Sequence, residues 1–400
     1  MHTQQKDNSN NKYKDYNEIE DASKCVIELI KCSLHNELPV EIPQKVNWAQ
    51  VLYLAANNSV VSMISPAVKR YKGDIPENIR KKIEAALLTT IYRLLNFQIE
   101  RENIFAKMEQ EGIAYLPLKG ILLAEYYPVA GMRWMCDNDI LYGKNDSEQG
   151  RNHESGKLKD IMLGLGYHAV HTGGVHDVYQ KEPFFNFEMH RKLVSANSPF
   201  AKYYENPWEK AILVKGKKYE YRFSDEDEYI FMLAHAYKHF DNSGCGIRTL
   251  VDEYVYVDKK KCMDWRYIDE QLRKIGLNSF EKSLKNAAIA AFSEDGVITE
   301  QEWDIISYMF NCGTYGTMSN RIRRELKRIQ SENALNQVNT KWHYIRKRFF
   351  VSEVMIQENY LFFYRHKNLR WLLPFYRILK GLIIHPKMLY YEWKNVRNFK

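Results

Sequence analysis

The sequence predicts an α+β protein in which a small sheet domain lies between helical regions. Apolar residues recur at helical spacing from Glu18 to Gln110, short strand-like runs follow between 111 and 222, and helical spacing returns after Ser224. Tyrosine is frequent while glycine and proline are scarce, with 28 Tyr, 19 Gly and 11 Pro in 400 residues. This composition also favours helix over an all-β fold.

Changes in composition and periodicity divide the chain into five parts. Residues 1–17 are polar and lack apolar periodicity, which predicts a disordered tail and neither a signal peptide nor a membrane span. The remaining parts are a helical domain over 18–110, a sheet domain over 111–222, a second helical domain over 223–340 and a basic, aromatic C-terminal region over 341–400.

The six cysteines are scattered and include no Cys-x-x-Cys pair. This pattern indicates reduced thiols rather than a disulfide framework or a zinc knuckle. We therefore expect a cytoplasmic protein.

The first helical domain is predicted to be a scaffold that packs on the sheet domain. Pro66 is a candidate break within one of its helices. The expected helices cover 22–34, 48–57, 60–71 and 76–110.

In the sheet domain, a Thr172-Gly173-Gly174 turn predicts a hairpin between two short strands. Helices are expected over 121–127 and from about Ser147 to Leu165. The expected strands cover 112–118, the run around 137–141, 167–171, 176–180 and 185–190.

Asp137 and Asp139 are the first candidate catalytic and metal-binding residues. The apolar residues around them indicate a short buried strand, on which both carboxylates share a face and Asn138 points away. Their Cα atoms would lie roughly 6.5–7 Å apart. Carboxylates at this spacing repel each other unless a cation lies between them, and hard oxygen ligands suit Mg²⁺, with Mn²⁺ as the alternative.

A third carboxylate, Glu188, lies on the polar face of the alternating run 185–190. The Asp-x-Asp pattern alone is weak, because most instances are solvated turns or strand ends. The buried strand, the nearby Lys119-Gly120 turn and Glu188 together strengthen the interpretation as a metal site.

Several short motifs together resemble a family of bacterial nucleotidyltransferase-like proteins within the DNA polymerase β-type superfamily. The resemblance covers about 45–260, and this chain has Lys119-Gly120 where the superfamily commonly has Gly-Ser. The motifs are Leu118-Lys119-Gly120, Tyr127-Pro128, Arg133, Asp137-x-Asp139 and Glu188-x-His190.

The resemblance implies a small mixed-sheet domain of the polymerase β type that uses an NTP donor and Mg²⁺. It implies transfer of a nucleoside monophosphate to an unidentified acceptor hydroxyl, with release of pyrophosphate. Asp137 and Asp139 would hold the metals. Glu188 would be a metal ligand, a general base or both.

Lys119, Gly120 and Arg133 are the candidate nucleotide-binding residues. If Gly120 opens a helix, its free amides face the preceding turn, where a phosphate can bind. Lys119 would supply a point charge and Arg133 a planar, bidentate phosphate contact. The alternative for each cation is an ordinary surface charge.

Five further residues are candidates for the acceptor site or the cleft opposite the acids. Their alternatives are a satisfied surface histidine or contacts within the helix bundle. His235 and His239 have zinc-compatible spacing, but no third ligand is evident. Asp252 is expected to pair with a neighbouring cation. The five are His190, His235, Lys238, His239 and Arg248.

The C-terminal region concentrates the positive charge of the chain. Residues 341–400 contain thirteen Lys and Arg against three Asp and Glu, whereas the whole chain has a net charge of +8. Basic residues interrupt every apolar stretch, which excludes a membrane span. Aromatics among these cations would form a bundle core, contact an anionic membrane at its inner face, or bind nucleic acid, which we rank last.

Two other functions fit the same residues. A glycosyltransferase would use Asp137-x-Asp139 to hold Mn²⁺ and a nucleotide sugar, without needing Glu188. A catalytically inactive, membrane-associated module would bind nucleotide without needing intact aspartates.

Overall fold

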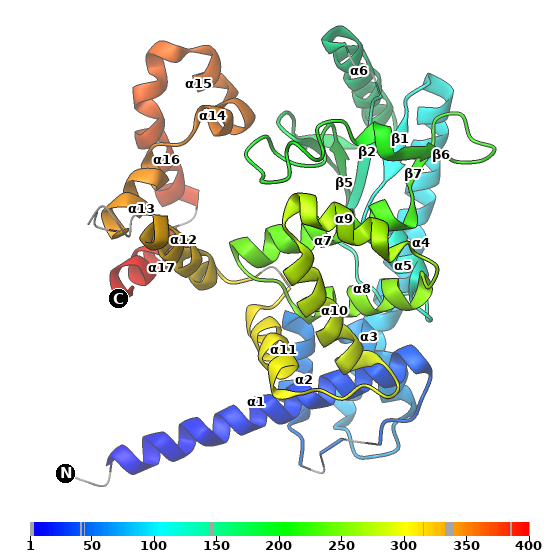
Figure 1. Ribbon diagram of the computed structural model, residues 1–400, viewed down its shortest axis with the longest axis vertical. Helices are drawn as coiled ribbons and strands as arrows, with labels where there is room; N and C mark the ends of the chain where they lie inside the picture. Colours follow the sequence, from blue (N-terminus) through cyan, green and yellow to red (C-terminus); the bar gives the residue numbers. More distant parts are fainter. Residues whose placement is uncertain are drawn as a thin grey trace.

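Helices make up most of the chain, and the strands are confined to its middle (Figure 1). The computed structural model describes residues 4–40, 42–43, 45–144, 147–314, 316–332, 340–384 and 386–399. The predicted α+β class, with a small mixed sheet flanked by helical regions, is confirmed.

Four helices precede the sheet. The first begins at Gln4, within the stretch whose composition predicts disorder. Pro66 does not break its helix, which continues to Arg70. The fourth helix ends at Glu111, and the next residue, Gly112, has a φ of 71°, the left-handed conformation that favours glycine. The helices are α1 (Gln4–His35), α2 (Trp48–Asn57), α3 (Val61–Arg70) and α4 (Glu77–Glu111).

The main sheet has five strands in the order β1-β2-β5-β4-β3, with β2 and β5 parallel and the other pairs antiparallel. The predicted hairpin is present as β3 and β4. Two short strands, β6 and β7, form a separate ladder. The strands are β1 (Tyr115–Pro117), β2 (Asn138–Tyr142), β3 (His168–His171), β4 (His176–Lys181), β5 (Phe185–His190), β6 (Ala211–Leu213) and β7 (Tyr221–Phe223).

Alternation along β2 and β5 gives the sheet one apolar and one polar face. Phe187 and Met189 are fully buried in an apolar cluster with residues of α4, whereas Glu188 and His190 face the opposite side, in a cavity lining. Helices α5 (Gly120–Tyr126) and α6 (Glu148–Gly164) also contribute to the apolar cluster. The candidate catalytic side chains of the sheet therefore lie on the face opposite its apolar core.

The second helical region covers the polar face of the sheet. Its first helix starts where the sequence predicts, because the Ser224 side chain accepts a hydrogen bond from the Asp227 amide. These helices share one continuous apolar core with α1, α2 and α3. They are α7 (Asp225–Asn242), α8 (Ile247–Lys259), α9 (Trp265–Ile275), α10 (Asn278–Phe292) and α11 (Glu300–Cys312).

The last helices form a separate lobe beside α7 (Figure 1). Only two small apolar clusters lie within this lobe, among the residues that the structure describes. The helices are α12 (Met318–Glu332), α13 (Thr340–Phe349), α14 (Glu353–Asn359), α15 (Leu361–Arg365), α16 (Leu373–Ile384) and α17 (Pro386–Asn398).

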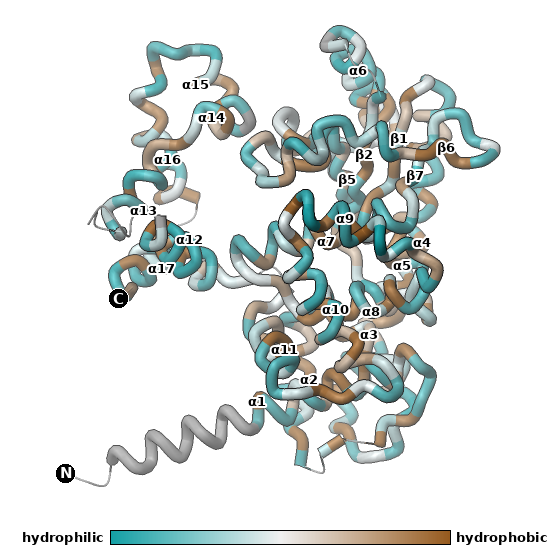
Figure 2. Tube along the Cα trace, in the orientation of Figure 1, coloured by the Kyte–Doolittle hydropathy of each residue, from teal (hydrophilic) through white to brown (hydrophobic). Residues whose placement is uncertain are grey.

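Apolar residues of this lobe lie largely at its surface, and Figure 2 shows hydrophobic segments along α16. Phe363 is buried, but Trp371 is 67% exposed and Ile383 is 80% exposed. The interpretation of these aromatics as a bundle core is therefore wrong for most of them. Within the described ranges, no helix combines the length and hydropathy that crossing a membrane requires.

Candidate active site

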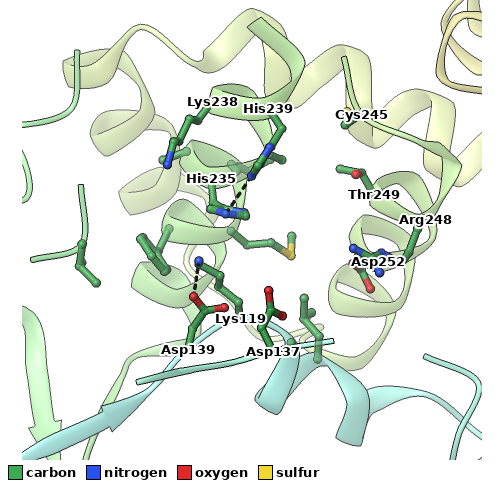
Figure 3. A pocket seen from close by; sticks show the side chains of 18 of the residues that line it. Lys119, Asp137, Asp139, His235, Lys238, His239, Cys245, Arg248, Thr249 and Asp252 are labelled. Atoms are coloured by element: carbon green, nitrogen blue, oxygen red, sulfur yellow. Dashed lines mark hydrogen bonds and ion pairs between the residues drawn. The ribbon is translucent and has the colours of Figure 1, made fainter. Parts of the chain in front are cut away.

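A cavity of about 370 Å³ lies between the polar face of the sheet and the helices α7 and α8 (Figure 3). All the site residues that the sequence singles out contribute to its lining. They are Lys119, Gly120, Arg133, Asp137, Asp139, Glu188, His190, His235, Lys238, His239 and Arg248.

The parallel pairing of β2 with β5 brings the acids together. Asp139 is the register partner of Glu188 on the adjacent strand. Asp137 lies one residue before β2, so the strand is shorter than predicted, yet both aspartates point into the cavity (Figure 3). Asn138 points away as expected, and its Oδ1 accepts a hydrogen bond of 2.9 Å from Arg101 on α4.

Asp139 is buried, and its Oδ1 atom has two close partners. Lys119 Nζ lies 2.8 Å from its Oδ1, and His190 Nε2 lies 2.7 Å from the same atom. Although burial opposes ionisation, Lys119 and His190 hold the pKa of Asp139 well below its usual range. His190, predicted for the acceptor or the cleft, lines the cavity and also contacts a catalytic candidate.

Asp137 and Glu188 have the opposite electrostatic environment. Asp137 accepts no hydrogen bond from the described residues, and burial together with the charge of Asp139 raises its pKa. Burial and the two aspartates raise the pKa of Glu188 to about 7. Among the described lysines and arginines, Lys119 alone forms an ion pair with one of these three carboxylates, so the acids outnumber the cations on this wall.

The chemistry of this donor set fits Mg²⁺. Asp137, Asp139 and Glu188 offer hard carboxylate oxygens beside a cavity that can accommodate a substrate phosphate. A divalent cation would relieve the mutual repulsion that raises the pKa of Asp137 and Glu188.

A second donor set adjoins the first and includes a residue that sequence reasoning missed. Ligand atoms of His176, Glu188 and His190 all lie within 4.8 Å of one another. Burial and the neighbouring His190 lower the pKa of His176 to about 4, so its imidazole is neutral, as metal ligation requires. Imidazole donors suit Zn²⁺ better than Mg²⁺.

The Lys119-Gly120 turn fits closely against Arg133. Lys119 has a φ of 50°, and a Cβ at Gly120 would lie 2.7 Å from Arg133 Nη1. Only glycine therefore fits at position 120 without a shift of Arg133.

Arg133 is bound inside the protein rather than free for a phosphate. Its Nε and Nη2 donate to the two carboxylate oxygens of Asp252 at 2.7 and 2.9 Å. Tyr127 donates a further hydrogen bond of 2.7 Å to Asp252. The predicted pairing of Asp252 with a cation is confirmed, and the bidentate geometry expected of Arg133 serves this buried pair.

The helix wall of the cavity carries cations and neutral histidines. The Nε2 atoms of His235 and His239 lie 3.2 Å apart. Burial and nearby lysines lower the pKa of both, to about 4 for His239. No third metal donor accompanies this pair among the described residues, which gives no support to zinc there.

Lys238 and Arg248 supply the positive charge of the helix wall, and Figure 3 shows Lys238 and Arg248 on separate helices above the acids. Lys238 has no acidic partner within the described ranges, and Arg248 contacts the Trp134 carbonyl at 3.4 Å. Burial of its ammonium and the charge of Lys119 lower the pKa of Lys238. A negative sheet wall thus faces a positive helix wall.

Comparison with known proteins identifies the family of the chain. A family described as uncharacterised nucleotidyltransferase matches residues 44–288. None of the curated proteins matches the sequence. The solution structure of the antibiotic-resistance factor ANT(2'')-Ia aligns at 13% identity over 52% of this chain and 92% of that chain, with a TM-score of 0.24. On the strength of the family match, the chain belongs to this nucleotidyltransferase family, whose enzymes transfer nucleotide groups.

Proposed function

We propose that the protein transfers a nucleoside monophosphate from an NTP to an acceptor hydroxyl in a reaction that depends on Mg²⁺. The observation that carries the proposal is a cavity lined by three acids, Asp137, Asp139 and Glu188, and also by the cations Lys238 and Arg248, with Asp139 and Glu188 as register partners on adjacent strands. A metal-bound triphosphate is complementary to both sides at once.

The acids would hold the metal, and the cations would hold the donor. Asp137, Asp139 and Glu188 are the metal ligands in this proposal, with Mn²⁺ as the alternative ion. When bound, the metal neutralises charge on the triphosphate. Lys238 and Arg248 would bind its outer oxygens, and Lys119 would keep Asp139 in place and ionised.

Glu188 would also accept the proton of the attacking hydroxyl. The acceptor oxygen attacks the α-phosphorus, a new P–O bond forms, and the bond to the β-phosphate oxygen breaks in line, so that pyrophosphate leaves. A carboxylate oxygen of Glu188 that does not bind the metal could accept this proton.

Pyrophosphate release with each of the four common NTPs and Mg²⁺, across a panel of hydroxyl acceptors, tests the proposal. We expect release by the wild type, and loss of release in Asp137→Asn combined with Asp139→Asn. Exposed Asp160 provides the matched control, Asp160→Asn. Equal release by the double variant, or turnover of a nucleotide sugar that survives Glu188→Gln, would favour other chemistry. Tight nucleotide binding without any release would favour the inactive module.

A second proposal concerns location: the C-terminal lobe binds the anionic inner surface of a membrane. Its support is the combination of local basic charge with exposed apolar side chains, including Trp371, Phe375 and Ile383. Nucleic acid would satisfy the cations but leave the aliphatic side chains in water.

Vesicle flotation of the full-length protein tests this location. Trp371→Ser with Ile383→Ser should reduce binding to phosphatidylglycerol vesicles, because apolar area is lost at the interface. Leu88→Ser on α4, where the side chain is 68% exposed, is the control and should bind as the wild type does. Unchanged flotation of the double variant would contradict the proposal.

A further inference from the structure

A second cavity, of about 550 Å³, lies where α7 meets the C-terminal lobe. Its lining comes from α7, α12, α13, α14, α16 and α17, and its volume is within the usual range for small-molecule sites. Lys238 belongs to the lining of both this cavity and the active-site cavity. The two spaces are therefore neighbours, with Lys238 at their border.

The second cavity has a strong excess of positive charge. Its lining contains seven basic and three acidic side chains. The basic residues are Lys238, Arg321, Arg324, Arg328, Lys347, Arg348 and Arg377, and the acidic residues are Asp241, Glu325 and Glu392.

Internal contacts leave the cavity with a net positive charge. Arg324 donates to the Phe240 carbonyl and the Tyr308 hydroxyl, and Arg377 donates to the Arg348 carbonyl, but these oxygens carry no opposing charge. Lys347 Nζ lies 3.3 Å from Glu325 Oε1, and Arg348 Nε lies 2.9 Å from Glu392 Oε1. These two acids therefore balance the charge of only two of the seven basic residues. Arg321 is exposed, and its side chain makes no hydrogen bond within the described ranges. A concave surface with several arginines and an uncompensated charge matches the oxygens of a phosphate group.

We propose that this cavity binds a phosphate group of the acceptor, so that the acceptor is a phosphate ester whose free hydroxyl reaches the active site past Lys238. This inference rests on the proposed function, which supplies the reaction at the hydroxyl. The phosphate ester stays intact there: its hydroxyl oxygen gains the nucleoside monophosphate, Glu188 takes the proton, and pyrophosphate leaves from the NTP.

The phosphate ester has two possible sources with the same chemistry. It is either a free metabolite, or the headgroup of a lipid held by the exposed apolar residues of α16 and α17. Glycerol 3-phosphate probes the first source, and vesicles of phosphatidylcholine with phosphatidic acid probe the second.

The helix α12 offers a matched pair of variants. Arg321 and Arg328 line the cavity, whereas Arg323 and Lys327 are exposed on the same helix and do not line it. Arg321→Ala with Arg328→Ala therefore removes two cavity charges, and Arg323→Ala with Lys327→Ala removes two charges from α12 outside the cavity. Thermal unfolding of all forms verifies that each variant is folded.

The experiment measures binding of each probe to full-length protein by calorimetry or flotation, with and without a saturating nonhydrolysable NTP and Mg²⁺. We expect the cavity variant to bind one of the two probes about tenfold or more weakly, and the control variant to bind as the wild type does. The probe that binds identifies the source.

Equal binding by the two variants, or no binding of either probe to the wild type, would overturn the inference. Binding of an RNA oligonucleotide in place of both probes would also overturn it. The proposed function fails separately: absence of NTP binding and pyrophosphate release would refute that function, even where the probe still binds the second cavity.

Discussion

The two walls of the active-site cavity carry opposite charges and are built differently. On the sheet wall, acids occupy register partners on β2 and β5, where strand pairing fixes their separation. On the helix wall, Lys238 and Arg248 come from α7 and α8, and their long side chains reach the cavity from different directions. A rigid acidic wall facing adaptable cations suits a metal held in fixed geometry and a triphosphate of variable conformation.

The walls also differ in whether their acids have basic partners. On the helix side, Asp252 accepts two hydrogen bonds from the Arg133 guanidinium and one from the Tyr127 hydroxyl. Its negative charge is therefore balanced within the protein. On the sheet side, Asp137 and Glu188 keep raised pKa values. Acids without a lysine or arginine partner among the described residues, such as Asp137 and Glu188, indicate a site for an external cation. A buried acid with a basic partner, such as Asp252, indicates a structural role.

The largest effect should come from the sheet wall. Asp139→Asn removes a metal ligand and the ionic partner of Lys119, so we expect pyrophosphate release to fall by about 10³-fold or more. Steady-state kinetics at saturating Mg²⁺ and NTP measures the change. A decrease no greater than that of Asp160→Asn would show that the acidic wall is not the reacting wall.

A structural effect should dominate at the buried pair of the helix wall. Asp252→Asn leaves the Arg133 guanidinium buried without its counterion, and should destabilise the protein by about 3–5 kcal/mol. Thermal and urea unfolding measure this loss, with the more exposed Asp258→Asn as control. The double substitution Arg133→Met with Asp252→Leu should recover part of the stability. If the double variant is no more stable than Asp252→Asn, then an unpaired buried charge is not the cause of the loss.

A smaller effect should follow from the cations. Lys238→Gln removes one charged contact to the triphosphate while leaving the acids intact, so KM for the NTP should rise about tenfold. Exposed Lys259→Gln on α8 should leave KM unchanged. If kcat falls and KM stays constant, then Lys238 does not bind the ground-state donor.

The smallest effect concerns Glu253, a fully buried acid of α8 that belongs to the cavity lining. Burial raises its pKa to about 8 from an ordinary value of 4.5, so the folded state retains a proton that the unfolded state loses in this interval. Stability is therefore lost as pH rises from about 4.5 to 8. Glu253→Gln should raise stability at pH 8 by about 1–2 kcal/mol and change it little near pH 4.5. A difference in unfolding free energy between the two proteins that stays the same at every pH would contradict this prediction.

Local patterns were sufficient to predict the five strands of the main sheet, but not the short strands β6 and β7. Alternation in 185–190 placed Glu188 and His190 on one face, and the two-residue period placed Asp139 opposite Asn138. The pairing of β2 with β5 is a long-range event that periodicity does not specify, so from the sequence the adjacency of Asp139 and Glu188 was a hypothesis, which the family resemblance then strengthened.

Long-range partners explain what the sequence left unassigned or misassigned. The carboxylate that binds Arg133 is 119 residues further along the chain, so a buried pair could not be told from a phosphate contact. His176 reaches the site only through the register of β4 with β5, in which it is opposite His190. In the C-terminal lobe, the sequence pattern did not predict which aromatic side chains are buried and which are exposed.

The central claim is that Asp137, Asp139 and Glu188 together hold the divalent ion that the NTP requires. Electron paramagnetic resonance of Mn²⁺ in the presence of a nonhydrolysable NTP measures this directly, without turnover. We predict that the wild type and His176→Gln bind Mn²⁺ together with the nucleotide, and that Asp137→Asn with Asp139→Asn loses this binding. Mn²⁺ binding that survives in the double aspartate variant but disappears in His176→Gln would contradict the claim and place the ion at the neighbouring histidine cluster.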